Sequence, residues 1–303
     1  MKERHRILPR ILLIIAPLIC IFITLFVGRY SIDPMTVVHT LLYKFGLGSW
    51  NGLTNEDITV IWQLRLPRAV LGAAVGASLA ASGAAFQGAF RNPLVNAGIL
   101  GVSNGAGFGA ALALLLFSSI ASTYSFAFIF FFFLVFLSYM IGRIYNTTPT
   151  VMLILGGVIV SAFFSALISI IKYVADPYNQ LPAIVFWLMG SLASVGQKQF
   201  FALIPIGIGL LIIYGVRWRI NVLSMGDKEA TALGVNVSRN KLLVITGATM
   251  ATAGAVCVSG VIGWVGLVIP HIGRMLVGNN NKKLIPVSIS LGACFVVLMD
   301  MIA

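Results

Sequence analysis

The stretch RLPRAVLGAAVGASLAASGAAFQGAFRNPL, residues 65–94, decides the fold of this chain. Residues 69–90 within it carry no charged side chain, and a helix of that length can cross a bilayer. Small residues recur at four-residue spacing in this run and in the next: Gly72 and Gly76, then Gly101, Gly105 and Gly109. Because helices in lipid associate largely through close backbone contact at small residues, both glycine stripes are predicted to pack against other helices.

The composition of the whole chain is that of a membrane protein. Hydrophobic residues make up 59% of the sequence and charged residues 9%, whereas a soluble domain carries about 25% charged residues. We therefore expect an all-α polytopic helix bundle, with residues 1–303 forming one transmembrane domain in the cell membrane. The predicted spans are roughly 11–27, 69–90, 97–117, 122–142, 150–171, 199–216, 241–260, 261–277 and 284–303.

The charge-free run 242–273 is too long for one upright helix and short for two. Gly260, Gly263, Gly266 and Pro270 interrupt it, which favours two passes with a short and irregular second pass. With the amino terminus in the cytoplasm, the inner segments hold most of the 20 Lys and Arg residues. Membrane topology thus explains the net charge of +12, and we expect no nucleic-acid partner.

Ionisable side chains at membrane depth usually mark a proton or ion pathway. Asp300 is the only acidic residue in the predicted spans, which disfavours a proton-coupled transporter or a cation channel. No GxxxxGK[ST] loop occurs, so the chain should not bind ATP itself. The three cysteines lie in apolar runs, and no His/Asp/Glu cluster lies at membrane depth. We therefore expect no catalytic residue, no metal site and no cofactor bound by this chain.

One inner segment, residues 217–240, is long enough to hold a short surface helix. In the sequence GDKEATALG within it, Asp227 can cap the amino end of a helix and Gly234 can end it. Ala230 and Leu233 then share a face that no predicted span covers. The segment is either a solvated connector or a docking helix for a soluble partner.

Several long motifs resemble one family. RLPR (65–68), the GASLAASGAAFQGAFRNPL run (76–94) and GILGVSNGAG (98–107) are similar to the FecCD-type permease subunits of ABC importers, which take up iron–siderophores, haem or cobalamin. FWLMGSL (186–192), GDKEATALGV (226–235) and GVIGWVGLVIPHIGR (260–274) match the same family in the same order. The resemblance implies a permease that moves an iron–siderophore or a related metal chelate into the cytoplasm. Cobalamin or haem is the alternative cargo, and an ion-coupled secondary transporter is the alternative class.

The resemblance also implies partners: a second permease subunit, identical or paralogous, two cytoplasmic ATPases that bind the ATP, and an external substrate-binding protein. It assigns roles by position. The residues concerned are Gly226, Asp227, Glu229, Ala230, Leu233 and Gly234 in a coupling helix that contacts the ATPase, Asn92, Pro93 and Leu94 in a cytoplasmic gate, and Arg65 and Arg68 for docking of the binding protein. Interfacial anchoring of the two arginines is the alternative to docking.

The family pattern continues after the position of Asp300 with an Arg and then a tenth span. Because this sequence ends at Ala303, the resemblance implies that the tenth span and that further outer Arg are missing from it. We expect the 303-residue form, with nine spans, to be unstable or inactive for that reason.

Overall fold

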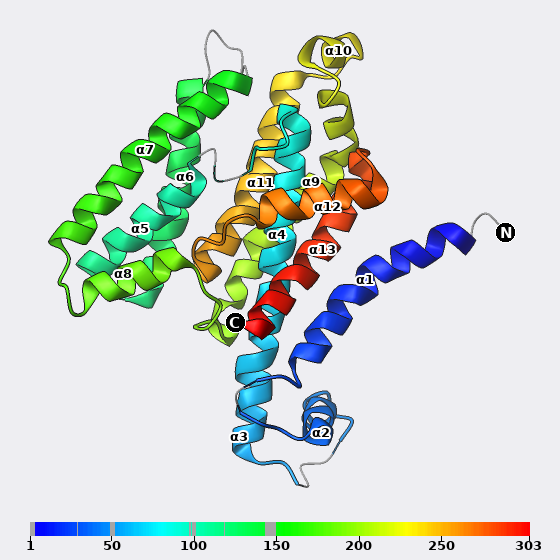
Figure 1. Ribbon diagram of the computed structural model, residues 1–303, viewed down its shortest axis with the longest axis vertical. Helices are drawn as coiled ribbons and strands as arrows, with labels where there is room; N and C mark the ends of the chain where they lie inside the picture. The colour runs from blue at the N-terminus through cyan, green and yellow to red at the C-terminus, as the bar shows by residue number, and fades with distance from the viewer. Residues whose placement is uncertain are drawn as a thin grey trace.

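The computed structural model describes the backbone of residues 4–28, 30–48, 52–96, 98, 101–117, 119–142 and 150–303, and the side chains of these residues outside 4–11 and 150. All regular elements in this part of the chain are helices, as predicted (Figure 1). They are α1 (Arg4–Thr24), α2 (Pro34–Lys44), α3 (Asn55–Ile58), the π-helical turn η1 (Thr59–Arg65), α4 (Leu66–Phe90), α5 (Val102–Leu116), α6 (Ile120–Gly142), α7 (Thr150–Val174), α8 (Gln180–Met189), the 3-10 turn η3 (Gln197–Ala202), α9 (Leu203–Leu223), α10 (Asp227–Ala232), α11 (Val237–Ser259), α12 (Val265–Val277) and α13 (Asn281–Ile302).

Within the described residues, six continuous helical segments are long and apolar enough to cross a membrane: Asn55–Phe90, Ile120–Gly142, Val151–Val174, Gln197–Leu223, Val237–Ser259 and Asn281–Ile302. The predicted spans at 11–27, 97–117 and 261–277 correspond to shorter apolar helices. The last of these, α12, has 13 residues. Its length is about 20 Å, which is less than the ~30 Å of bilayer hydrocarbon. The run 242–273 is therefore divided at Gly260, and its second part is short, as predicted.

α4 is the central helix of the bundle. It contacts α9, α11, α12 and α13 and is almost entirely buried. The Gly/Ala-rich sequence explains this position, because side chains with one carbon or none let several helices approach at once. Gly76 lies against the backbone of Gly292 in α13, and Gly83 lies against the backbone of Gly266, the second residue of α12. A β-carbon added at either position would overlap that backbone.

The central helix begins earlier than predicted. α3, η1 and α4 run as one helix from Asn55 to Phe90, whereas the span was expected to start at Ala69. Its amino end is capped by Thr54, whose Oγ1 accepts a hydrogen bond from the N–H of Asp57 at 3.1 Å. The charged residues in this part lie on a helix that extends beyond the apolar run 69–90.

Figure 1 shows two ends of the bundle, which we call the α10 end and the α2 end. α10 projects at the first, between the end of α9 and the start of α11. α2 and α3 lie at the opposite end. α5, α6, α7 and α8 form a group on one side of α4, and α1 packs against α13 on the other side. α11 joins the first group to the centre, since it contacts both α6 and α4.

Candidate functional site

The predicted coupling segment forms a short helix, α10, which ends as predicted. Gly234 follows it with φ of 76°, a left-handed conformation that glycine adopts without strain. The N–H of Gly234 donates to the carbonyl of Thr231, and the N–H of Val235 donates to the carbonyl of Ala230, both at 2.9 Å. This is the Schellman pattern of bonds that satisfies the last carbonyls of a helix.

The amino end of α10 differs from the prediction. Asp227 was expected to be the capping residue, but Gly226 precedes the helix without a side-chain cap and Asp227 is the first helical residue. The carboxylate of Asp227 instead accepts a hydrogen bond from Nζ of Lys241 at 2.7 Å. The prediction of an Asp227 cap is therefore wrong, because the ion pair with Lys241 uses that side chain.

Through Lys241, α10 is joined to the second turn of α11. The Lys241 side chain is 1% exposed, while that of Asp227 is 47% exposed. A buried ammonium group is costly unless it is paired, so this ion pair holds Asp227, and with it the start of α10, in one position. No sequence pattern predicts this ion pair. Asp227 and Lys241 are 14 positions apart and lie on different helices, so no spacing rule for a single helix pairs them.

One face of α10 is seated on the bundle and the other is open. Ala230 is fully buried because α10 contacts the ends of α9 and α11, so the expectation that Ala230 lies on an uncovered face is wrong. Leu233 is 60% exposed, and Met225, just before the helix, is 59% exposed. Glu229 is also exposed, four positions before Leu233. The open surface of α10 and its start thus combines two apolar side chains with the carboxylate of Glu229 and the exposed ammonium of Lys228.

The predicted gate residues form a turn directly after α4, at the α10 end. Arg91 has φ of 52°, which is uncommon for a residue with a β-carbon. Oδ1 of Asn92 then accepts a hydrogen bond from the N–H of Leu94 at 2.9 Å. Pro93 and Leu94 are exposed. This turn lies next to α10, since Nη1 of Arg91 is 3.3 Å from the place where a β-carbon on Gly226 would be.

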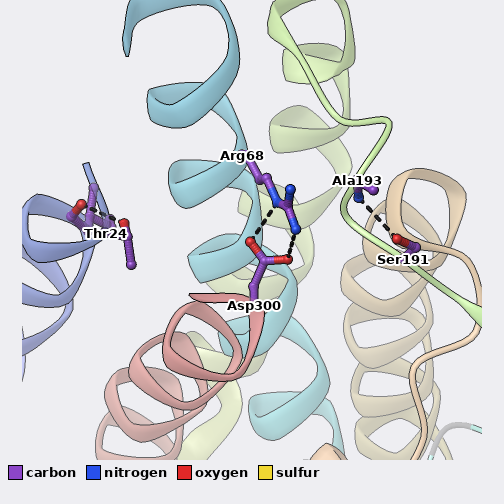
Figure 2. A network of polar contacts seen from close by, with 6 residues as sticks. Thr24, Arg68, Ser191, Ala193 and Asp300 are labelled. Carbon is purple, nitrogen blue, oxygen red and sulfur yellow. Dashed lines mark hydrogen bonds and ion pairs between the residues drawn. The ribbon is translucent and has the colours of Figure 1, made fainter. Parts of the chain in front are cut away.

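The two arginines predicted for docking have partners inside the chain. Arg68 donates from Nε and Nη2 to the two carboxylate oxygens of Asp300, at 2.7 and 2.8 Å (Figure 2). Arg65 donates from Nη1 to the carbonyl of Leu25 at 2.8 Å and from Nη2 to the carbonyl of Tyr30. These bonds join the central helix to α13 and to the segment after α1. Docking of a binding protein at these residues stays a prediction.

The stripe Gly101, Gly105 and Gly109 has two structural roles. A β-carbon at Gly105 would lie 2.7 Å from the carbonyl oxygen of Phe130 in α6, and one at Gly109 would overlap the carbonyl of Phe126. These two glycines are thus points of backbone contact between α5 and α6. Gly101 is the residue before α5 and has φ of 82°, so its glycine is required by the backbone conformation.

Sequence reasoning missed a further polar contact at the α10 end. Nη1 of Arg274 in α12 donates to Oε1 of Gln87 in α4 at 2.7 Å, and Nε2 of Gln87 donates to the carbonyl of Gly266 at 3.1 Å. Gln87 is 5% exposed. Among the described residues there is no group of three or more His, Cys, Asp or Glu that could hold a metal ion.

Comparison with known proteins matches residues 13–303 to the FecCD transport family. The molybdate import system permease protein MolB of Haemophilus influenzae is 40% identical over 282 residues, which are 93% of this chain and 83% of MolB. The cobalamin import system permease protein BtuC of Halobacterium salinarum is 39% identical over 83% of this chain and 68% of its own. The iron(3+)-hydroxamate import system permease protein FhuG of Bacillus subtilis is 32% identical over 93% of this chain and 84% of its own.

A solved structure that is described as an inward-facing conformation of a metal-chelate type ABC transporter has the same fold. It is 39% identical to this chain, with a TM-score of 0.85 over 97% of this chain and 90% of the solved one. The motifs around the central helix, α10 and α12 thus belong to one known architecture. The chain belongs to the FecCD transport family, as the integral membrane permease subunit of an ABC transporter whose ATP is hydrolysed by a separate ATPase.

Proposed function

We propose that this chain is the permease of an importer that moves an iron–siderophore or a related metal chelate into the cytoplasm. Three of its relatives are named as permeases of import systems for molybdate, cobalamin and iron(3+)-hydroxamate. A shared architecture does not identify the cargo, because specificity resides in particular groups and not in the fold. The cargo is therefore proposed as a class, with iron–siderophore as the first member to test and cobalamin and haem as alternatives.

The observation that carries an ATP-driven mechanism is the way α10 is held. A six-residue helix is too short to be stable alone. Here it is fixed at its first residue by the buried Lys241 and in its middle by the buried Ala230. Leu233 and Glu229 are left exposed. A short helix that is held rigidly, with apolar and charged side chains left exposed, suits the transmission of force from the ATPase to the bundle.

We further infer that the α10 end faces the cytoplasm. Basic residues gather near the end of α9, in α10 and at the starts of α11 and α13: Arg217, Arg219, Lys228, Arg239, Lys282 and Lys283. Cytoplasmic segments of membrane proteins carry such an excess of Lys and Arg. In this orientation the amino terminus is cytoplasmic, and the α2 end, where Arg65 and Arg68 lie, meets the external binding protein.

Uptake by proteoliposomes tests the proposal. The permease is reconstituted with its partner permease subunit, its ATPase and its binding protein, with ATP inside the vesicles. Ferric siderophore, haemin, cobalamin and molybdate are offered separately. Uptake of a chelate that requires enclosed ATP and is unchanged by ionophores supports the proposal. Uptake that an ion gradient drives without the ATPase would instead establish a secondary transporter.

Molybdate is the second candidate cargo. The specific observation in its favour is the 40% identity to MolB, which extends over 93% of this chain. Molybdate is a small oxyanion, whereas siderophores and cobalamin are large organic molecules. The two candidates are distinguished by the same vesicles, because only one of the two radiolabelled cargoes should accumulate.

A further inference from the structure

A surface cavity of about 370 Å³ lies at the α10 end, between the central helix, the turn that follows it, and α12 and α13. Its size is within the range of small-molecule sites. Its polar lining is formed by two guanidinium groups, one hydroxyl and four amides: Arg91, Arg274, Ser224, Gln87, Asn92, Asn279 and Asn281. We propose that this cavity is a binding site for a tetrahedral oxyanion. The inference goes beyond the proposed function, since binding at this site does not depend on import.

The first cation of the cavity, Arg274, is held in a defined orientation. Its Nη1 donates to Oε1 of the buried Gln87, and Gln87 in turn donates to the carbonyl of Gly266. A guanidinium has five N–H donors in a fixed plane, and Gln87 accepts from one of its two terminal nitrogens. The plane of Arg274 is thus set by protein contacts before any ligand binds, which lowers the cost of ordering it.

The second cation, Arg91, reaches the cavity from the turn after the central helix. Its left-handed backbone places the side chain over Gly226, where Nη1 comes within 3.3 Å of a β-carbon position. Gly226 is also contacted by the carboxylate of Glu229. That carboxylate belongs to α10 and is not part of the cavity lining. An anion in the cavity would therefore lie between the turn after α4, which holds the predicted gate residues, and the start of α10.

The charge of the lining selects the class of ligand. No Asp or Glu is among the described residues that line the cavity, and the nearby carboxylate of Glu229, which contacts Gly226 beside Arg91, lies outside the lining. Arginine is suited to bidentate recognition of phosphate-like oxygens, and amide N–H groups add further donors. The oxyanion has two possible sources. It is either a free ion, such as phosphate or molybdate, or the phosphate of an anionic lipid, which basic pockets between membrane helices bind.

Equilibrium dialysis of the assembled permease–ATPase complex tests the site. The complex is held in nanodiscs of neutral phosphatidylcholine at fixed ionic strength, with labelled phosphate or labelled molybdate as the probe. We expect saturable binding that Arg91→Asn weakens by about tenfold or more, the loss of one charge-assisted hydrogen bond. Asn tolerates the left-handed backbone at this position. Arg274→Lys should also weaken binding, because it keeps the charge and loses the planar geometry.

The matched control is Lys282→Gln, which removes an exposed cation near the start of α13 that does not line the cavity. This variant should bind as the wild type does. If phosphatidylglycerol in the nanodisc competes with free phosphate in the wild type and not in Arg91→Asn, the lipid is the source. If it does not compete, the free ion is the source. Three outcomes would overturn the proposal. They are the absence of saturable binding, equal binding by all variants, and loss of binding of the labelled oxyanion when the background salt is chloride at the same ionic strength. None of these outcomes bears on import of a chelate.

Discussion

Nε of Arg68 lies 2.7 Å from Oδ2 of Asp300, and Nη2 of the same arginine lies 2.8 Å from Oδ1 (Figure 2). The pair joins the first turn of α4 to the last turn of α13, across 232 positions of sequence. The Arg68 side chain is 36% exposed and that of Asp300 is 18% exposed. The pair therefore lies between a screened surface ion pair and a fully desolvated one.

This ion pair should stabilise the contact between α4 and α13. We predict that Arg68→Gln and Asp300→Asn each lower the midpoint of thermal unfolding in detergent. The double variant should lose less than the sum of the two, with a coupling energy of about 1 kcal/mol. Thermal unfolding of the wild type, the two single variants and the double variant completes this double-mutant cycle. Strictly additive losses would mean that the two side chains act independently.

The position of α10 should depend on the ion pair between Asp227 and Lys241. Asp227→Asn leaves Lys241 buried without its carboxylate, so this change should loosen α10 and accelerate proteolysis between residues 224 and 236. Adding Lys241→Met removes the buried charge as well and should recover part of the protection. Limited proteolysis with mass spectrometry measures both effects. Equal cleavage of the single and double variants would count against this role of the ion pair.

The glycines of α5 should be sensitive to size. Gly105→Leu forces a side chain against the backbone of Phe130, and we predict a loss of about 1–3 kcal/mol of stability with reduced expression. The matched control is Gly215→Leu in α9, where an added β-carbon meets no atom within 4 Å. It should unfold as the wild type does. Similar behaviour of the two variants would show that α5 and α6 can separate without cost.

Docking of the binding protein should depend on the arginines of the α2 end. Arg65→Glu with Arg68→Glu is predicted to weaken its affinity by about tenfold, and wild-type affinity should fall as salt rises. Asp300→Asn, which releases Arg68 from its internal partner, should make docking tighter. Surface plasmon resonance over a salt series measures all three. If neither salt nor any of the three substitutions changes the affinity for the binding protein, the two arginines have a structural role only.

The helical architecture was predictable because it depends on local composition. A charge-free run rich in Gly and Ala indicates a helix packed by others, and Gly76 and Gly105 do lie at such contacts. The start of the central helix was not predictable in this way. Its first turns, from Asn55 to Arg65, carry charge, and only the cap at Thr54 and the contacts of Arg65 show that the helix extends there.

The long-range polar partners could not be read from the sequence. Each pair joins helices whose relative height is fixed only when the bundle packs, so linear spacing carries no information about it. The prediction that Ala230 and Leu233 share an uncovered face of α10 was wrong for the same reason. Ala230 and Leu233 are close in the sequence, but the ends of α9 and α11 cover only the first. The pairs are Arg68 with Asp300, Lys241 with Asp227, and Arg274 with Gln87.

The most direct test of the central claim is ATP-driven uptake of the chelate by proteoliposomes that contain Leu233→Asp. This change puts a carboxylate on the open face of α10, and Leu47→Asp makes the same change at an exposed leucine outside α10, in the turn after α2. We predict that Leu233→Asp inserts normally, loses the ATPase on co-purification and abolishes uptake, while Leu47→Asp keeps both. Wild-type uptake and ATPase retention by Leu233→Asp would contradict the assignment of α10 as the coupling helix.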